Sequence, residues 1–305
     1  MKPLHLTRRT LIAVAAAAAV APHAAARSPA VTEALADLEM RAGGRLGACF
    51  IHTASGAKAG YRMDERFALC STFKLPLAAA ILRAADEGKL NLDTVVPYTK
   101  ADMVPHAPVT EANLAKGGMT IRALAEAAQK QSDNPAANLL LKQLGGPAAL
   151  TQFFRDLGDA VTRIDRYEPE MNRVPPGDER DTTSPAAIAA TVEKIVDSNK
   201  VLSRASRELL IDWMVDTATG AKRIRAGLPQ GWRAGDKTGT GLDEHNAKLN
   251  DVAVAWEPGF RPLVIAAYYN TATPVDTIRD EDQAVLAEVG RIAAGWAPDA
   301  LGTMR

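Results

Sequence analysis

The stretch NDVAVAWEPGFRPLVIAAYYNTA, residues 250–272, contains two runs of extended-strand character that are separated by a turn. Val, Ile and Tyr recur in these runs and Pro and Gly stand between them, which is typical of adjacent antiparallel strands. The stretch WRAGDKTGTG, residues 232–241, adds a third run before them. Near the other end of the chain, RLGACFIHT at 45–53 and KAGYRMDE at 58–65 predict a hairpin. We therefore expect one antiparallel sheet of five strands, built from both ends of the chain.

The middle of the chain has helical patterning instead. From about residue 71 to residue 211 apolar residues recur at helical spacing, and a last amphipathic helix is expected from about 280 to 296. The residues expected to cap such runs are Thr32, Thr120, Asn134 and Ser184. This order of elements predicts an α+β fold, in which a five-stranded antiparallel sheet flanked by helices carries an inserted all-α domain.

The domain boundaries follow from the same change of pattern. We place a discontinuous α/β domain at residues 27–64 and 217–305, and the all-α domain at residues 65–216. A junction between two domains is a common position for a ligand cleft, so we expect the active site there.

Composition describes a soluble globular protein with an ample core. Of its 305 residues, 47% are hydrophobic and 24% are charged. The 36 basic and 36 acidic residues give a formal net charge of zero. Nothing electrostatic therefore favours nucleic acid or an anionic membrane as a partner.

The N-terminal stretch MKPLHLTRRTLIAVAAAAAVAPHAAARS has the order of a secretory signal. Positive charges come first, an apolar run follows at 11–21, and small residues stand at 24–26. This order predicts a signal peptide over residues 1–26, and its apolar run is too short to span a bilayer. The pair Arg8 and Arg9 also resembles a twin-arginine export signal. We expect an exported, periplasmic or secreted protein with no membrane attachment after cleavage of the signal.

Two cysteines, Cys49 and Cys70, are few for an exported chain. Stability must come from the core rather than from a disulfide framework. We expect both to be buried free thiols, although the sequence leaves open whether they pair.

Ser71 and Lys74 form an S-x-x-K pair that suits nucleophilic catalysis. A serine hydroxyl becomes an effective nucleophile only when a base lies next to it, and residues three apart share a helix face. The spacing alone is a weak signal, because Ser55 and Lys58 repeat it in the predicted hairpin turn. Pro76 is awkward here, since it would remove a backbone hydrogen bond from the helix.

Two further three-residue motifs decide which of the two S-x-x-K pairs is catalytic. Ser132-Asp133-Asn134 lies between predicted helices, and Lys237-Thr238-Gly239 lies on a predicted strand. The order S-x-x-K, S-D-N, K-T-G resembles the signature of class A β-lactamases and penicillin-binding proteins. The resemblance therefore identifies Ser71 and Lys74 as the catalytic S-x-x-K pair and leaves Ser55 and Lys58 as turn residues.

The stretch RYEPEMNRVPPGDERDTTSP, residues 166–185, resembles the omega loop of class A serine β-lactamases, which we place at 166–181. The matching residues are Glu168 and Asn172, and a base is needed there because an acyl-enzyme persists unless water is activated against its ester. The resemblance also implies an ion pair between Arg166 and Asp181 that holds the two ends of the loop.

The resemblance implies roles for the matching positions. Ser71 attacks the lactam carbonyl, and either Lys74 or Glu168, acting through water, accepts its proton. Ser132 passes a proton to the departing nitrogen, and Glu168 with Asn172 activates water for deacylation. The implied substrate-binding residues are Asn134, Lys237, Thr238, Gly239, Thr240, Arg223 and His106. The amides of Ser71 and Thr240 would form the oxyanion hole.

Some positions depart from the commonest family pattern. No arginine follows the K-T-G motif on the next strand, and Arg223 resembles the substitute found in a subgroup that includes some carbapenemases. Its neighbours Lys222 and Arg225 could equally be solvated surface charges, and Arg223 is the favoured substitute. His106 stands where the family places an aromatic at the cleft mouth, and an ordinary loop histidine is the alternative. Gly241 stands where the subgroup has a cysteine, so Cys70 lacks that partner.

The most favoured function is hydrolysis of β-lactam antibiotics through a serine acyl-enzyme, by a monomer that confers resistance. Penicillins and cephalosporins are the expected substrates, and the sequence leaves carbapenems open. The alternatives are a penicillin-binding carboxypeptidase or transpeptidase, which usually lacks the loop glutamate, and a non-hydrolytic antibiotic sensor. The sequence implies no cofactor, and His52 and His245 have no spacing that suggests a metal site.

Overall fold

The computed structural model describes residues 28–197 and 199–300. The expected signal peptide at 1–26 therefore lies outside the described residues. Within the two described ranges, no helix combines the length and the apolar character needed to cross a membrane.

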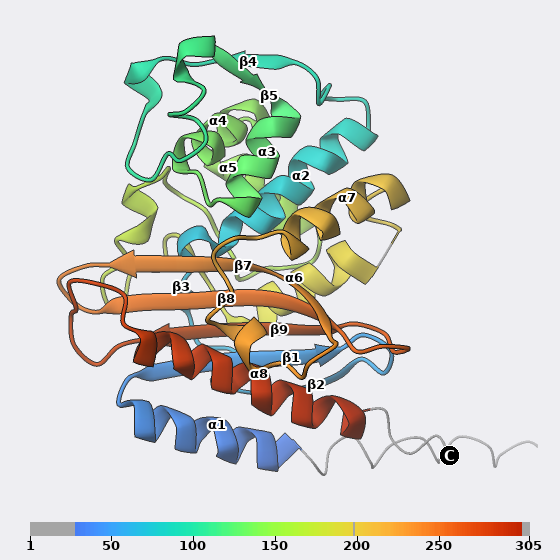
Figure 1. The fold of residues 1–305 in the computed structure, drawn as a ribbon, viewed down its shortest axis with the longest axis vertical. Helices are drawn as coiled ribbons and strands as arrows, with labels where there is room; N and C mark the ends of the chain where they lie inside the picture. The colour runs from blue at the N-terminus through green and yellow to red at the C-terminus, as the bar shows by residue number, and fades with distance from the viewer. Residues whose placement is uncertain (1–27, 198, 301–305) are drawn as a thin grey trace, which may run out of the picture.

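A five-stranded sheet forms the centre of the fold, in the order β2-β1-β9-β8-β7. The strands are β1 (Arg45–His52), β2 (Ala57–Tyr61), β7 (Arg233–Leu242), β8 (Ala247–Trp256) and β9 (Leu263–Asn270). Every neighbouring pair is antiparallel. Arg45 stands opposite Asn270, so strands from the two ends of the chain lie side by side (Figure 1). The predicted five-stranded antiparallel sheet and the α+β class are confirmed.

Helices cover both faces of this sheet (Figure 1). On one face lie α1 (Ser28–Ala42) and α8 (Asp280–Ala300). The remaining helices are α2 (Lys74–Asp86), α3 (Ile121–Lys130), α4 (Asn134–Leu144), α5 (Pro147–Asp156), α6 (Pro185–Asp197) and α7 (Arg204–Val215). Of these, α6 and α7 contact the other face of the sheet, and α2 packs against both of them.

Short elements connect the helices. The short strands are β3 (Phe67–Ala68), which pairs with β6 (Thr182–Thr183), and β4 (Val95–Pro97), which pairs with β5 (Gly118–Thr120). The 3₁₀ turns are η1 (Cys70–Phe73), η2 (Lys100–Asp102), η3 (Leu114–Lys116), η4 (Glu170–Asn172) and η5 (Ile224–Gly227). The predicted all-helical middle therefore holds two small strand pairs that its patterning did not indicate.

Helices bury both faces of the sheet. Successive side chains of a strand point to opposite faces, so each strand contributes to both cores. In β1, Cys49 and Ile51 belong to the core shared with α2 to α7, whereas Phe50 packs in the core beneath α1 and α8. In β9, Tyr268 and Tyr269 divide in the same way. This explains why the strands lack an apolar–polar alternation.

Two of the expected caps are wrong. Asp133, not Asn134, caps α4, and its side chain accepts the backbone N–H of Ala136. Thr32 lies inside α1, which begins four residues earlier at Ser28. Thr120 caps α3 as predicted.

Candidate active site

Ser71 lies in η1, and Lys74 is the first residue of α2. A 3₁₀ turn has about three residues per turn, so side chains at i and i+3 eclipse each other. Lys74 Nζ accordingly lies 3.0 Å from Ser71 Oγ. Because α2 begins at Lys74, Pro76 falls in the first helical turn, where its missing N–H costs no helical bond. Pro76 is therefore compatible with the helix. Ser71, the expected nucleophile, lies just before α2 rather than within it.

Lys74 is fully buried and contacts residues from two distant parts of the chain. Its Nζ atom donates to the backbone oxygen of Ser132 at 2.8 Å and to Asn134 Oδ1, and it lies 3.2 Å from Glu168 Oε1. Burial lowers the pKa of Lys74, although the charge of Glu168 acts in the opposite direction. The neutral amine is therefore easier to reach than in water.

The carboxylate of Glu168 points at the nucleophile. Its Oε1 atom lies 3.3 Å from Ser71 Oγ, and its Oε2 atom accepts a hydrogen bond from Asn172 Nδ2. The peptide bond between Glu168 and Pro169 is cis. Asn172 Oδ1 is buried and has no hydrogen-bond partner within the described ranges. An acceptor without a partner beside a carboxylate fits a position for an ordered water.

Asn138 holds the backbone of Glu168 in place. Its Oδ1 atom accepts the N–H of Glu168 at 2.9 Å, and its Nδ2 atom donates to the carbonyl of Glu168 at 2.9 Å. Sequence reasoning missed this residue. A usable signal existed, because Asn138 follows Asn134 by one turn of α4 and shares its face.

An ion pair joins the ends of the 166–181 segment. Arg166 Nε lies 2.5 Å from Asp181 Oδ2, as the resemblance implied. Asp181 is fully buried and its Oδ1 atom also accepts the N–H groups of Asp165 and Arg166 at 2.8 and 3.0 Å. The segment is therefore a closed loop, with Glu168 near its start.

The strand β7 brings a second buried amine to the site. Lys237 Nζ donates to Ser132 Oγ at 3.1 Å and to the carbonyl of Thr238 at 2.8 Å. Burial lowers the pKa of Lys237 well below its ordinary value, and the nearby charge of Lys74 lowers it further. Ser132 therefore stands between the two amines. Its backbone is left-handed, with φ of 58°, which is unusual for a residue other than glycine.

Arg223 reaches the site through Thr240. It is only 3% exposed. Its Nη1 atom donates to the carbonyls of Gly239 and Asn250, each at 2.8 Å, and its Nη2 atom donates to Thr240 Oγ1 at 2.7 Å. Because Thr240 Oγ1 accepts this bond, its own hydrogen is free to donate elsewhere. Thr238 Oγ1 lies 2.6 Å from Thr219 Oγ1, a partner that sequence reasoning did not identify.

Gly239 lets β7 approach η1 closely. A Cβ atom at this position would lie 2.9 Å from the carbonyl oxygen of Leu69, a distance that real side chains do not tolerate. The requirement for glycine here is therefore steric.

His106 is exposed, beside Asn134. Its Nε2 atom lies 3.0 Å from the carbonyl of Gln131, and its own carbonyl accepts the N–H of Asn134 at 2.9 Å. Asn134 Nδ2 donates to the carbonyl of Pro105 at 2.9 Å, which leaves its second hydrogen free. His106 is thus at the edge of the group that contains Asn134 and Lys74.

Both cysteines are buried free thiols, as predicted. Burial raises the pKa of each thiol to about 12, so both pack as neutral groups. Cys70 also has a left-handed backbone, with φ of 44°, immediately before Ser71.

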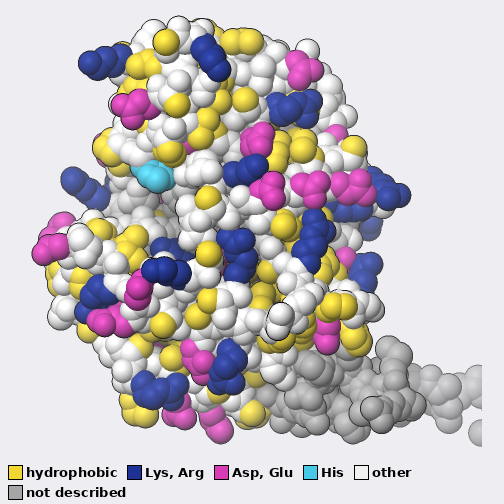
Figure 2. Space-filling view, viewed as in Figure 1, with side chains coloured by type: hydrophobic (Ala, Val, Ile, Leu, Met, Phe, Trp, Pro, Cys, Tyr) yellow, Lys and Arg dark blue, Asp and Glu magenta, His cyan; other side chains and the backbone are white. Residues whose placement is uncertain are grey.

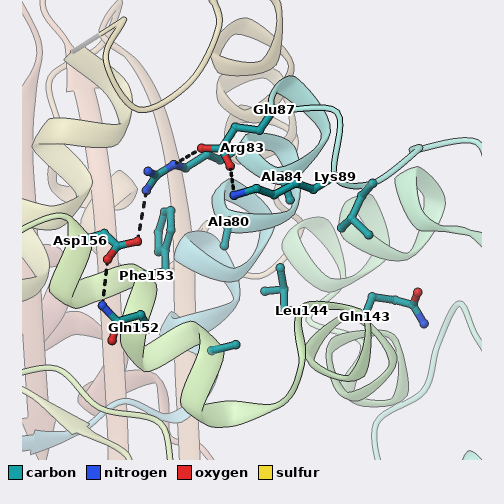
Figure 3. Close-up of a pocket in the computed structure, with 12 residues that line it drawn as sticks. Ala80, Arg83, Ala84, Glu87, Lys89, Gln143, Leu144, Gln152, Phe153 and Asp156 are labelled. Atoms are coloured by element: carbon teal, nitrogen blue, oxygen red, sulfur yellow. Dashed lines mark hydrogen bonds and ion pairs between the residues drawn. The ribbon is translucent and has the colours of Figure 1, made fainter.

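A separate hollow of about 300 Å³ lies between α2 and α5 (Figure 3). Its charged side chains already pair: Arg83 lies 2.9 Å from Glu87 and 3.9 Å from Asp156, and Lys89 lies 2.6 Å from Glu87. None of the proposed catalytic residues lines it, so we assign it no role.

Neither the face shown in Figure 2 nor the metal-binding residue types of the described ranges indicate another site. In the face shown in Figure 2, basic and acidic side chains are interspersed, in keeping with the zero net charge. Among residues 28–197 and 199–300, no group of three or more His, Cys, Asp or Glu side chains is placed to hold a metal ion.

Comparison with known proteins agrees with this geometry. The model of a family described as the β-lactamase enzyme family matches residues 30–297. The chain belongs to this family. The β-lactamase L2 of Stenotrophomonas maltophilia is 48% identical over 278 residues, which cover 90% of this chain and 88% of that protein. The carbapenem-hydrolyzing β-lactamase KPC of Klebsiella oxytoca is 44% identical over 264 residues, covering 86% and 87%.

Solved structures narrow the assignment to class A. A class A β-lactamase of the last common ancestor of Gram-negative bacteria superimposes with a TM-score of 0.82 and 54% identity, covering 87% of this chain and 98% of that one. This protein is therefore a class A β-lactamase, and the penicillin-binding alternative is not favoured.

Proposed function

We propose that this class A β-lactamase hydrolyses β-lactam antibiotics in two steps, through an ester on Ser71. The observation that carries the proposal is the position of Ser71 Oγ, which lies 3.0 Å from Lys74 Nζ and 3.3 Å from Glu168 Oε1. A hydroxyl held between an amine and a carboxylate can lose its proton as it attacks.

In the acylation step Ser71 Oγ attacks the lactam carbonyl and the C–N bond breaks. The proton of Ser71 passes to Lys74 or Glu168, and Ser132 Oγ delivers a proton to the departing nitrogen. Ser132 is suited to this because its hydroxyl lies 3.1 Å from Lys237 Nζ and 3.4 Å from Lys74 Nζ. The oxyanion is stabilised by the backbone N–H groups of Ser71 and Thr240.

In the deacylation step a water attacks the ester carbonyl, and Glu168 accepts its proton. Asn172 Oδ1 is buried and has no hydrogen-bond partner among the described residues, which supports a water position beside Glu168 Oε2. The C–O bond to Ser71 then breaks, and the serine regains its proton.

Substrate binding uses the end of β7. The carboxylate of the antibiotic is held by Lys237, Thr238 and Thr240, and Arg223 orients the Thr240 hydroxyl so that its hydrogen faces the substrate. Gly239 keeps the strand open to close approach. The free hydrogen of Asn134 Nδ2 binds the amide of the acyl side chain, with His106 at the cleft edge.

The proposed substrates are penicillins and cephalosporins, and carbapenems are included because a relative named for carbapenem hydrolysis shares 44% identity. The proposal extends to resistance in the host, export to the periplasm or beyond after loss of residues 1–26, and action as a monomer. It also retains the domain division at 27–64, 65–216 and 217–305, and an omega loop at 166–181.

The test is burst and steady-state kinetics of the wild type and Glu168→Ala, on a chromogenic cephalosporin and a penicillin. We expect the variant to acylate at Ser71 and then stall. Glu170→Ala is the matched control, because Glu170 is an exposed glutamate on the same loop. Fast steady turnover by Glu168→Ala would refute the deacylation role. A wild type without turnover would favour a penicillin-binding protein.

A further inference from the structure

A buried ion pair lies where β7 turns into β8. Lys248 Nζ contacts Asp243 Oδ2, and the two side chains are only 3% and 4% exposed. Neither residue has a role in the proposed reaction. A buried ion pair adds little net stability compared with an apolar pair, and its best-attested use is to specify one geometry.

Asp243 organises the connection between the two strands. Its Oδ1 atom accepts the N–H groups of His245 and Asn246 at 3.0 and 3.1 Å, and its own N–H donates to the carbonyl of Asn246 at 3.3 Å. The carboxylate is thus fixed by the turn, and its second oxygen is a fixed acceptor for Lys248.

The stem of Lys248 passes over Gly241, its partner in the β7–β8 ladder. A Cβ atom built on Gly241 would lie 3.1 Å from Cys70 Sγ, 3.5 Å from the carbonyl oxygen of Asn172 and 3.5 Å from Lys248 Cδ. Three separate segments therefore meet above this glycine: the residue before the nucleophile, the loop that carries Glu168, and the lysine stem.

The space beside Gly241 links the ion pair to Asn172, because the Asn172 carbonyl oxygen and Lys248 Cδ each lie 3.5 Å from the same Cβ position. Asn172 donates through its side chain to Glu168 Oε2, and its backbone belongs to η4, which packs on β7. If the lysine stem moved, the packing around Gly241, which η4 borders through the Asn172 carbonyl, would change. The position of Asn172 would then be less closely defined, and so would the carboxylate that it orients.

We propose that the Asp243–Lys248 ion pair is a positioning element for deacylation, a role that rests on the proposed function of Glu168. By holding the lysine stem over Gly241, the pair sets the distance between η4 and the end of β7. We expect acylation to depend less on it, because Lys74 Nζ contacts Ser71 Oγ and the backbone oxygen of Ser132, and neither residue belongs to η4.

The test separates the two chemical steps in Lys248→Met. Acylation rates come from pre-steady-state bursts, and the acylated fraction at steady state comes from mass spectrometry of quenched enzyme with a chromogenic cephalosporin. We expect acylation within threefold of the wild type and deacylation slower by about tenfold, since a small misplacement of a reacting group can reduce rates by up to about 100-fold. The acylated fraction therefore rises. Lys248→Arg keeps the ion pair and should restore deacylation to within threefold.

Controls separate positioning from general destabilisation. Ile195→Val removes a methyl group from the buried side of α6 and should lower Tm without raising the acylated fraction. If Lys248→Met does not fold, the double variant Asp243→Asn with Lys248→Met removes both charges, keeps the Oδ1 acceptor of the turn, and should show the same selective loss. Unchanged rates, or equal losses in both steps, would overturn the inference. A wild type that forms no acyl-enzyme at Ser71 would overturn the proposed function itself, and this inference with it.

Discussion

Ser71 Oγ lies 3.3 Å from Glu168 Oε1, although 97 positions separate the two residues in the chain. Lys74 Nζ donates to the same serine oxygen at 3.0 Å. With this donor in place, the hydroxyl hydrogen of Ser71 is directed at the carboxylate rather than at the amine. The resting geometry therefore favours Glu168 as the first acceptor of the serine proton, with Lys74 as the donor that stabilises the resulting alkoxide.

This geometry predicts that Glu168→Gln slows both steps, but unequally. Deacylation should fall by about 10²–10⁴-fold, which is the usual contribution of a general base. Acylation should fall by only about tenfold, because Lys74 remains as a second proton acceptor. Stopped-flow acylation and mass spectrometry of the trapped ester measure the two rates separately. Acylation at the wild-type rate would instead make Lys74 the sole acceptor.

The route from Arg223 through Thr240 predicts a defect in binding rather than in chemistry. Arg223→Ala should raise KM for carboxylate-bearing substrates by about tenfold and leave kcat within threefold, since a charge-assisted hydrogen bond is worth about 1.5–3 kcal/mol. Thr240→Ala should act similarly, and the double variant should be no worse than the more impaired single one. Lys222→Ala is the control, because its exposed ammonium pairs with Asp280. Additive effects would mean that Arg223 contacts substrate independently.

The approach of Gly241 to Cys70 predicts that Gly241→Cys forms a disulfide. A Cβ atom at Gly241 would lie 3.1 Å from Cys70 Sγ. In a disulfide the corresponding distance is about 3 Å, given an S–S bond of about 2.05 Å. Oxidation should leave one titratable thiol in the denatured variant, that of Cys49, and should stabilise the protein by about 2–4 kcal/mol.

Two measurements check this prediction. Thiol titration under denaturing conditions counts the free groups, and Tm is compared with and without reductant. The wild type, with two free thiols, should not respond to the oxidant. Three titratable thiols in the oxidised variant would show that β7 and η1 do not approach as described.

Asp236 predicts an unusual dependence of stability on pH. It is fully buried next to Lys237, and burial raises its pKa from 3.8 to about 6, despite the opposing charge of Arg225. Below about pH 4 the carboxyl is neutral in both folded and unfolded chains. Between about pH 4 and 6 the folded state binds the proton more tightly, so the contribution of this group to stability falls as pH rises. The total change is about 2–3 kcal/mol, since one pKa unit corresponds to about 1.4 kcal/mol.

Asp236→Asn isolates this effect, because the amide does not titrate. The unfolding free energy of each protein is measured by urea titration at several pH values. From pH 4 to pH 6, the value for the wild type should fall relative to that for the variant. A constant difference across that interval would show that Asp236 is ionised throughout. The buried neighbour Asp251, whose pKa burial also raises, is coupled to this titration, so the transition belongs to the pair.

Much of the fold was predictable because each element carries its own local signal. Pro and Gly punctuate the strands of the sheet, and Thr120 precedes an apolar helical run that it caps. The errors are local too. Asn134 and Asp133 are both good N-cap residues, and only the position of the first helical residue decides between them.

The residues of the candidate site were predictable where they belong to a sequence motif. They were not predictable where a residue acts by a hydrogen bond to another residue that is distant in the chain. Asn138 holds the backbone of Glu168 from a helix 30 positions earlier, and the sequence marks it only by its place one turn after Asn134. Arg223 was found by resemblance, but its hydrogen bond to Thr240 is visible only in the tertiary structure.

By itself, the sequence determined the order and type of the elements and the chemical groups available to them, because periodicity and turn residues record the local burial of each segment. Only the tertiary structure decided which of those groups meet. Packing of the sheet against the helices brings Ser71, Glu168 and Lys237 into one site, and it places the Lys248 stem against Gly241. Contacts of this kind depend on how surfaces distant in the chain fit together, and no local pattern encodes them.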